Sequence, residues 1–313
     1  MENICIRSLT VLVFVVGLAH PSAAQAVRVP GTNVSMTPPL RFSVAQQYPG
    51  FERADVQATI MVTELPVAAA GMMRSMTKPA LLKRGMELIA GRDAVINGSP
   101  ARLLHVRQAT ATAEVFKWML IAGNAGTTVM IVGTYPTSES PAIGDAIEQA
   151  LLTASWSAAT RPSVVEGLLF RIEPTGKLKL AQRVSNMLMF TESGTIGSPG
   201  SSEALYIAAQ SLGKVSIGDV RVFAETRAKQ TKLMTGFTNF SGRPIQVGGL
   251  DAFELEADGT DTRSGQAMRL YQVIIPDETG YFILQGLCRA DRARELFAEF
   301  RTVTGTFRRV VPQ

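Results

Sequence analysis

Cysteine and histidine are scarce in this sequence. Its 313 residues include two of each, and Cys5 and His20 both lie within the first 26 residues. That segment, MENICIRSLTVLVFVVGLAHPSAAQA, predicts a secretory signal peptide cleaved after Ala26, with an early arginine, a short apolar run and small residues at its end. The mature chain would then keep only Cys288 and His105, which excludes a disulfide within one chain.

Long apolar runs are also missing. The run inside the signal peptide is far shorter than the ~20 residues that a membrane-spanning helix needs, and no later run approaches that length. We therefore expect no membrane span and a mature protein that is periplasmic or secreted. With 46% hydrophobic residues, the chain can still bury conventional cores.

The net charge of +5 is spread among acidic residues and is not gathered in one run. A dispersed pattern of this kind is typical of solvated helix faces. There is no interleaving of basic and aromatic residues, so we expect no nucleic-acid partner.

One sequence pattern occurs twice in the chain. GRDAVINGSPARLLHV at 91–106 corresponds to GRPIQVGGLDAFELEA at 242–257. Asn97-Gly98 and Gly248-Gly249 each predict a two-residue hairpin turn, because both central residues of such a turn need positive φ. Further matches follow in the same order: strand pairs at 117–133 and 269–286, amphipathic helices near 143–154 and 293–303, and a weaker match between the segments that begin at Met36 and Ile172.

The repeat is about as long as a whole domain. We predict a signal peptide at 1–26, a first domain at 27–160 and a second at 161–313, joined by a linker at 157–164. Each domain would contain an early strand, a strand near 56–65 or 203–211, a helix near 79–90 or 226–235, two hairpins and a final helix. Adjacent hairpins favour antiparallel sheets with helices on their faces, so the predicted class is α+β.

This order of elements resembles the PsbP-like superfamily, with its PsbP, DcrB and Mog-type proteins, in two tandem copies. The resemblance lies in the Pro-containing start, the NGSPARLL hairpin and the terminal helix followed by an aromatic, Trp156 or Phe307. It implies an antiparallel sheet flanked by helices and a non-catalytic role in binding or assembly. The second copy carries an extra Gly/Ser-rich insert at 192–204, either a surface loop or a partner contact.

Catalytic signals are weak. His105 stands alone on a strand, and a nucleophile needs an orienting base and acid beside it. S-x-x-K occurs twice, at Ser75 and Ser211, without the further motifs of serine-lysine enzymes. Glu254 and Glu256 alternate with apolar residues on one strand, so we expect both to face water.

Metal-binding signals are equally thin. Met72, Met73 and Met76 could offer thioethers to Cu(I), but methionines in helices more often fill gaps in a core. Glu256, Asp258 and Asp261 lack the spacing of a calcium loop. We expect no catalytic residues, no cofactor and no metal site.

The duplicated Gly-Arg pair leaves Arg92 and Arg243 as the candidate binding residues. The sequence favours a non-catalytic protein that binds an envelope protein or a cell-wall component. The alternatives are a carrier of a small apolar, lipid-like ligand and, third, a serine-dependent hydrolase. A free or an intermolecularly paired Cys288 is compatible with this pattern.

Overall fold

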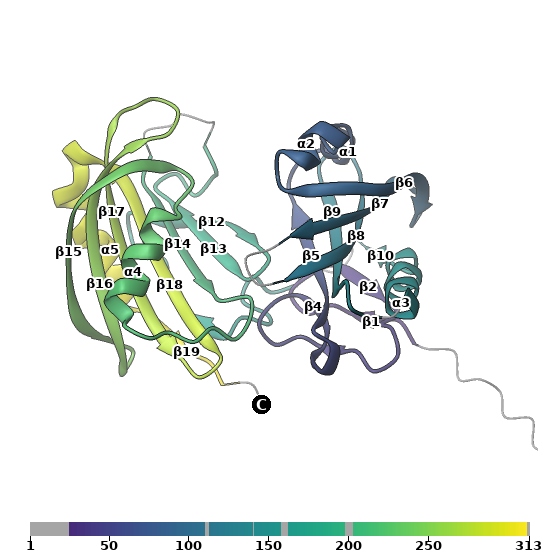
Figure 1. The fold of residues 1–313 in the computed structure, drawn as a ribbon. Helices are drawn as coiled ribbons and strands as arrows, with labels where there is room; N and C mark the ends of the chain where they lie inside the picture. The colour runs from purple at the N-terminus through teal and green to yellow at the C-terminus, as the bar shows by residue number, and fades with distance from the viewer. Residues whose placement is uncertain (1–24, 110–112, 140, 158–161, 198–202, 312–313) are drawn as a thin grey trace, which may run out of the picture.

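The computed structural model describes residues 25–109, 113–139, 141–157, 162–197 and 203–311. Most of the predicted signal peptide, residues 158–161 of the predicted linker and residues 198–202 of the predicted insert lie outside this range. The chain is an α+β protein with two tandem domains (Figure 1).

Each domain is built on a seven-stranded antiparallel sheet. In the first domain the strand order is β3-β4-β5-β9-β8-β7-β6, and in the second it is β12-β13-β14-β18-β17-β16-β15. Counted along each domain, the order is the same, 1-2-3-7-6-5-4. The duplication seen in the sequence is therefore a duplication of topology.

The strands of the first sheet are β3 (Ser43–Val44), β4 (Gly50–Arg53), β5 (Ala58–Leu65), β6 (Met86–Ile96), β7 (Ser99–Ala109), β8 (Glu114–Gly123) and β9 (Thr128–Pro136). Those of the second are β12 (Lys179–Val184), β13 (Met187–Thr191), β14 (Leu205–Gln210), β15 (Met234–Val247), β16 (Leu250–Asp261), β17 (Ala267–Asp277) and β18 (Gly280–Arg289). Both predicted turns are present, because Asn97, Gly98, Gly248 and Gly249 all have positive φ.

Short strands complete each domain beside its main sheet. In the first domain β2 (Val34–Met36) pairs with β1 (Val27–Arg28) and with β10 (Ser155–Trp156). In the second, β11 (Phe170–Arg171) pairs with β19 (Arg308–Arg309). In each domain a strand near the start thus pairs with the segment that follows the last helix.

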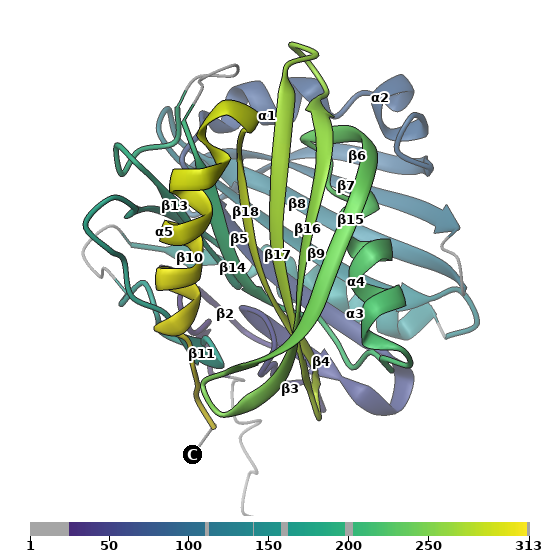
Figure 2. The same cartoon turned by 90° about the vertical axis from the view of Figure 1, so that its left-hand side faces the viewer.

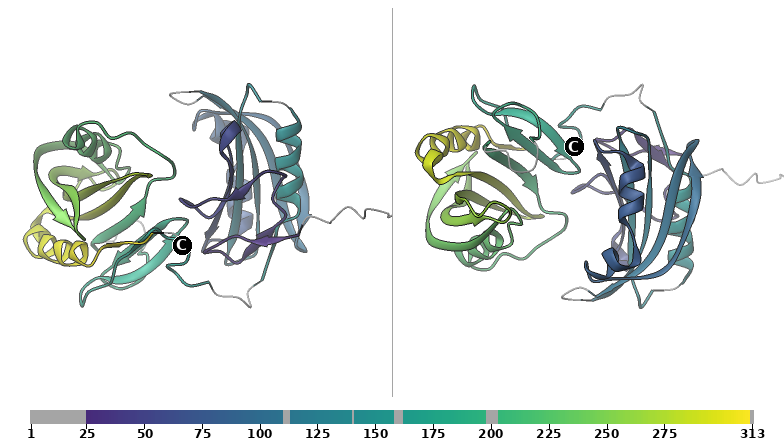
Figure 3. Two further views of the ribbon diagram at one scale, coloured as in Figure 1. Left: turned by 90° about the horizontal axis from the view of Figure 1, so that it is seen from below. Right: turned by 90° about the horizontal axis from the view of Figure 1, so that it is seen from above.

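Helices lie on both faces of each sheet (Figures 2 and 3). The terminal helices are α3 (Pro141–Leu152) and α5 (Ala293–Gly305), as predicted. The opposite faces carry α1 (Ala69–Ser75) and α2 (Lys78–Leu82) in the first domain and α4 (Val220–Lys229) in the second. Two short 3-10 turns, η1 (Ala54–Val56) and η2 (Ala290–Arg292), precede β5 and α5.

Two predicted helices were misplaced. The segment 79–90 is helical only to Leu82, because Gly85 adopts φ +73° and the chain then extends into β6. The helix expected at 226–235 begins earlier, at Val220, where the Asp219 side chain accepts a hydrogen bond from the Val222 N–H and caps the first turn. The segment after it is already strand β15 from Met234.

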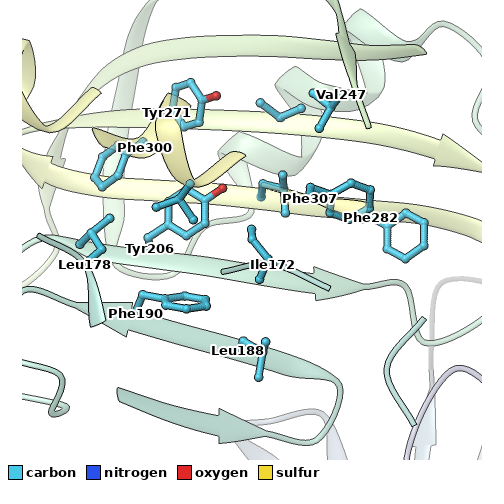
Figure 4. Packing of buried hydrophobic residues seen from close by; sticks show 14 of the residues in the cluster. Ile172, Leu178, Leu188, Phe190, Tyr206, Val247, Tyr271, Phe282, Phe300 and Phe307 are labelled. Atoms are coloured by element: carbon cyan, nitrogen blue, oxygen red, sulfur yellow. The ribbon is translucent and has the colours of Figure 1, made fainter. Parts of the chain in front are cut away.

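The cores lie between the sheets and these helices. Aromatic residues dominate the core under α5, where Tyr206, Tyr271, Phe282, Phe300 and Phe307 are all buried (Figure 4). The core under α1 and α2 is rich in methionine instead: Met72, Met73, Met76, Met86, Met119 and Met130. The three methionines considered for Cu(I) therefore take part in core packing.

The two domains meet through the loop that joins β3 to β4. The Gln47 carbonyl oxygen accepts hydrogen bonds from Asn186 Nδ2 at 3.1 Å and Gln210 Nε2 at 2.9 Å. Both donor residues are buried in the second domain. Arg28 of the first domain also forms an ion pair with Glu166. These contacts fix the domains side by side.

One glycine in each domain lets the terminal helix touch the sheet. A Cβ on Gly133 would lie 2.1 Å from Ile147 Cγ2 of α3, and a Cβ on Gly286 would lie 2.4 Å from Phe300 Cδ2 of α5. Both distances are shorter than any real contact. The glycines that end the matched strand pairs are thus explained by helix packing.

We expect Gly133→Ala and Gly286→Ala each to lower the free energy of unfolding by about 1–3 kcal/mol, the usual cost of overpacking. Urea denaturation followed by circular dichroism measures this. Gly71→Ala is the control, because nothing lies within 4 Å of its Cβ position on α1. Equal stability of all three variants would contradict the packing role.

Candidate functional site

The candidate site is a groove that the second domain forms beside its terminal helix. In the second domain it has a volume of about 440 Å³ and is lined by Ser241, Gly242, Arg243, Glu254, Glu256 and Arg301. The residues come from β15, β16 and α5. The groove therefore brings together Arg243, Glu254 and Glu256, which the sequence singled out separately.

Glu254 lies at the centre of this groove. Its side chain is only 6% exposed, so the expectation that it faces water was wrong. It accepts from Arg243 Nη2 at 3.0 Å and from Arg301 Nε at 3.2 Å. The alternation of β16 does place Glu254 and Glu256 on one face, but α5 covers that face and supplies Arg301.

The ion pairs continue along β16 as a chain. Arg301 also binds Glu256, which pairs with Arg269 at 3.1 Å, and Arg269 reaches Asp258 at 2.7 Å. The arginines thus alternate with carboxylates, and each carboxylate has at least one guanidinium partner.

The first domain has an arginine at the corresponding position, with different partners. Arg92 lies at the position of Arg243, but it faces Leu103 across the strands where Arg243 faces Glu254. Its partner is Glu148 of α3, at 2.7 Å. Glu148 directly follows Ile147 in α3, and Arg301 directly follows Phe300 in α5, so the two residues occupy matching helix positions. This helix residue is acidic in the first domain and basic in the second. The strand residue opposite the arginine also differs, being Leu103 in the first domain and Glu254 in the second.

His105 takes the place of Glu256 in the first domain. Its ring stacks on Trp118 with centroids 4.3 Å apart, and its Nε2 lies 3.2 Å from the Tyr135 hydroxyl. Burial lowers the pKa of His105, and the nearby Glu148 carboxylate opposes this effect. A neutral, half-buried imidazole packed among aromatic rings fits a structural role.

The other sequence candidates lie apart from the groove. Ser75 ends α1 and donates to the Met72 carbonyl, while Lys78 begins α2, so the pair does not share a helix. Ser211 is buried and accepts a hydrogen bond from the Tyr281 N–H. Cys288 is free and buried on β18, and burial raises the pKa of its thiol to about 12, which disfavours the reactive thiolate.

The acids considered for calcium are used otherwise. Glu256 and Asp258 bind Arg269, and Asp261 accepts from the N–H groups of Arg263 and Ser264 to close a turn. Over the described part of the chain, no group of three or more His, Cys, Asp or Glu residues is placed to hold a metal. Within that same part, no helix is long and apolar enough to cross a membrane.

The insert leaves the second sheet between β13 and β14, where the first domain has only η1. Its base is tied down, because the Glu192 carboxylate accepts from the Ala204 N–H and from Arg292 at 2.7 Å. Ser193 and Glu203 also bond to each other across this base. A contact with a partner through the insert stays a prediction.

No family model and no curated protein sequence matches this chain. Several solved structures are weakly similar. A protein of unknown function and putative regulator, PA94 from Pseudomonas aeruginosa, is 18% identical over 44% of this chain and 99% of its own, with a TM-score of 0.30. The immunity protein TplEi of the T6SS from Pseudomonas aeruginosa is 9% identical over 91% and 96%, with a TM-score of 0.32.

The Tle4-Tli4 complex contains a chain that is 10% identical over 84% of this chain and 94% of its own, with a TM-score of 0.33. At such low identities and TM-scores, none of these similarities assigns a function to this protein. The PsbP-like resemblance likewise stays a prediction.

We expect Glu254→Leu to destabilise the protein by about 1–3 kcal/mol, because it leaves Arg243 and part of Arg301 unpaired beside a buried leucine. Adding Arg301→Glu rebuilds the arrangement of the first domain and should restore much of the loss. Urea denaturation of the single and double variants gives the coupling free energy. If the losses of unfolding free energy from Glu254→Leu and Arg301→Glu simply add in the double variant, the acidic helix residue does not compensate for the leucine on the strand.

The lowered pKa of His105 predicts a pH dependence. A group whose pKa is lower in the folded state contributes stability above its unfolded value of about 6.5, and this contribution is lost as the pH falls through the folded value. Wild-type stability should therefore fall between pH 7 and pH 5 more steeply than that of His105→Gln. Parallel stability curves for the two proteins would exclude His105 as the titrating group.

Proposed function

We propose that this chain is an exported, non-catalytic binding protein of the cell envelope. It acts in the periplasm or after secretion, and its partner is an envelope protein or a cell-wall component. The observation that carries this proposal is the recurrence of one exposed, salt-bridged arginine at the same position in both domains, Arg92 and Arg243. The predicted signal peptide is the basis for placing the protein outside the cytoplasm.

The geometry of these arginines favours binding. Arg92 is 52% exposed and Arg243 is 65% exposed, yet each is held by a carboxylate that is at most 18% exposed. A guanidinium fixed in this way loses little conformational entropy when it binds a second acidic group. Arg92 uses Nη2 for Glu148, and Arg243 uses Nε and Nη2 for Glu254.

The surroundings of these arginines support binding over catalysis. Arginines pair with the carboxylates of the groove, and the corresponding position of the first domain holds a histidine packed on Trp118. Ser75 and Ser211 do not line the groove, and both engage backbone groups. A serine-dependent hydrolase is therefore the least supported of the three functions.

A small-ligand carrier is the alternative that the structure favours next. A pocket of about 360 Å³ lies where the domains meet, lined largely by apolar residues that include Pro30, Ala45, Leu168, Leu169 and Val310. A lipid-like molecule would suit such a lining. Native mass spectrometry of protein purified from its own envelope should show a bound small mass for a carrier and the bare chain for an adaptor.

We expect the mature protein to capture a specific partner from the native envelope, and the double variant Arg92→Gln/Arg243→Gln to bind it at least tenfold more weakly, since charge-assisted hydrogen bonds are each worth about 1.5–3 kcal/mol. Surface plasmon resonance with the identified partner measures the affinity.

Arg221→Gln is the matched control for this experiment. Arg221 is 68% exposed on α4 and pairs with Glu225 of its own helix, so its loss removes one of the two positive charges that the double variant loses, at a position outside the groove. If this control weakens binding as much as the double variant, general surface charge and not the positions of Arg92 and Arg243 explains the affinity.

A further inference from the structure

The two domains end in strands whose free edges differ. β6 is the last strand of the first sheet and β15 the last strand of the second, so within the residues that the structure describes each has one side without a partner strand. Figure 1 shows β6 at its end of the first sheet, next to α2. Ile89, Ala90, Gly91, Arg92 and Asp93 form an uninterrupted exposed run along β6.

The hairpin turns decide which backbone groups face outward. In a hairpin with a two-residue turn, the residues that flank the turn form a hydrogen-bonded pair, and every second pair after it does the same. Ile96 and Ser99 flank the first turn, so Ala94 and Arg92 are also bonded to β7. The N–H and C=O groups of Gly91, Asp93 and Val95 therefore point away from the sheet.

The same argument gives the outward residues of β15 as Gly242, Pro244 and Gln246, because Val247 and Leu250 flank the second turn. Proline has no N–H, and on an edge strand it occupies the outward position, where it prevents a further strand from pairing. Two irregularities of register, between Thr235 and Thr238 and between Thr238 and Ser241, interrupt this edge further. The edge of the second sheet is thus closed to strand addition.

The edge of the first sheet lacks these protections over seven residues. Asp93 occupies the position of Pro244, and the pairing of β6 with β7 is regular from Ala90 to Ile96. Val95 is 73% exposed beside it. Two copies of one folding unit therefore differ at the feature that controls strand addition.

We propose that the open edge of β6 binds an extended segment of a partner protein, which adds as an eighth strand and places an acidic side chain opposite Arg92. This inference deepens the proposed function, because it names the partner as a protein and the mode as strand addition. Backbone hydrogen bonds to Gly91, Asp93 and Val95 supply affinity, and Arg92 supplies selectivity.

Charge argues against a second copy of this chain at the same edge. When two identical strands pair in antiparallel orientation, a two-fold axis relates them, so the residue at the centre of the pairing lies opposite its own copy. If the pairing is centred on the middle of the open edge, Asp93 lies opposite Asp93 or Arg92 lies opposite Arg92. Like charges directly opposite each other destabilise a strand pair. An acidic residue of a different chain meets no such repulsion, since Arg92 is half exposed and uses only Nη2 for Glu148.

Asp93→Pro tests the inference, because it gives β6 the outward proline of β15 and leaves the bonds to β7 in place. The probe is a fluorescent nine-residue peptide of alternating threonine and valine with a central glutamate and terminal lysines. We expect Asp93→Pro to weaken its binding at least tenfold, the effect of losing about two backbone hydrogen bonds. Asp93→Asn, which removes only the charge, and Gln246→Pro, which adds a proline to the other edge, should stay within about twofold of wild type.

A second measurement does not depend on the folding of the proline variant. The same peptide with methylated backbone nitrogens should bind wild-type protein at least tenfold more weakly. Hydrogen exchange should slow at the amides of Gly91, Asp93 and Val95 when the unmodified peptide binds. Equal affinity of both peptides, or unchanged exchange at these amides, would overturn strand addition.

The envelope partner separates this inference from the proposed function. If Asp93→Pro captures the partner as well as wild type while Arg92→Gln/Arg243→Gln does not, the proposed function stands and the strand-addition site is wrong. If wild type captures no envelope partner but binds the peptide, the strand-addition site stands and the proposed function is wrong. A wild-type dimer in sedimentation that Asp93→Pro dissociates would overturn the assignment of the edge to a different protein.

Discussion

The two-residue turns at Asn97-Gly98 and Gly248-Gly249 determine much of what the outer hairpins can do. They fix the register of β6 on β7 and of β15 on β16, and a shift by one residue would exchange the two faces of each hairpin. With this register, Arg92 and Arg243 lie on the face that the terminal helix covers in part. The same register decides that Asp93 and Pro244 present their backbone outward.

Duplication within one chain allows the two sites to be compared without any other sequence. Where the helix carries Glu148, the strand opposite the arginine carries Leu103, and where the helix carries Arg301, the strand carries Glu254. A helix arginine without Glu254 would face Arg243 across the groove, and like charges would repel. Both edge hairpins carry the arginine, and each domain supplies its carboxylate from a different element, α3 in the first domain and β16 in the second.

Much of the fold follows from local signals. Glycines at the turns, apolar alternation in the strands and the stripes of α3 and α5 predicted the repeated hairpins, the terminal helices and the α+β class. The helices on the other faces were predicted less accurately, because Gly85 ends α2 through a positive φ and Asp219 starts α4 through a side-chain cap, and each of these signals rests on a single residue. The rest of the site depends on contacts between residues far apart in the sequence, which local patterns do not reveal. The burial of Glu254 depends on Arg301, 47 residues later in the chain, and a reading of β16 alone assigns it to water.

The difference between the two edges has a physical consequence for the molecule as a whole. A long free edge exposes unpaired backbone groups and favours unintended association, so an edge is normally shortened, bulged, charged or blocked by proline. β15 has two register irregularities and Pro244. β6 has one irregularity, between Leu88 and Ala90, and from Ala90 to Ile96 its only protection is the charge of Arg92 and Asp93. These charges oppose pairing with a second copy of the chain but favour a strand that carries an acidic residue opposite Arg92. An edge with these two properties is the arrangement expected of a binding surface.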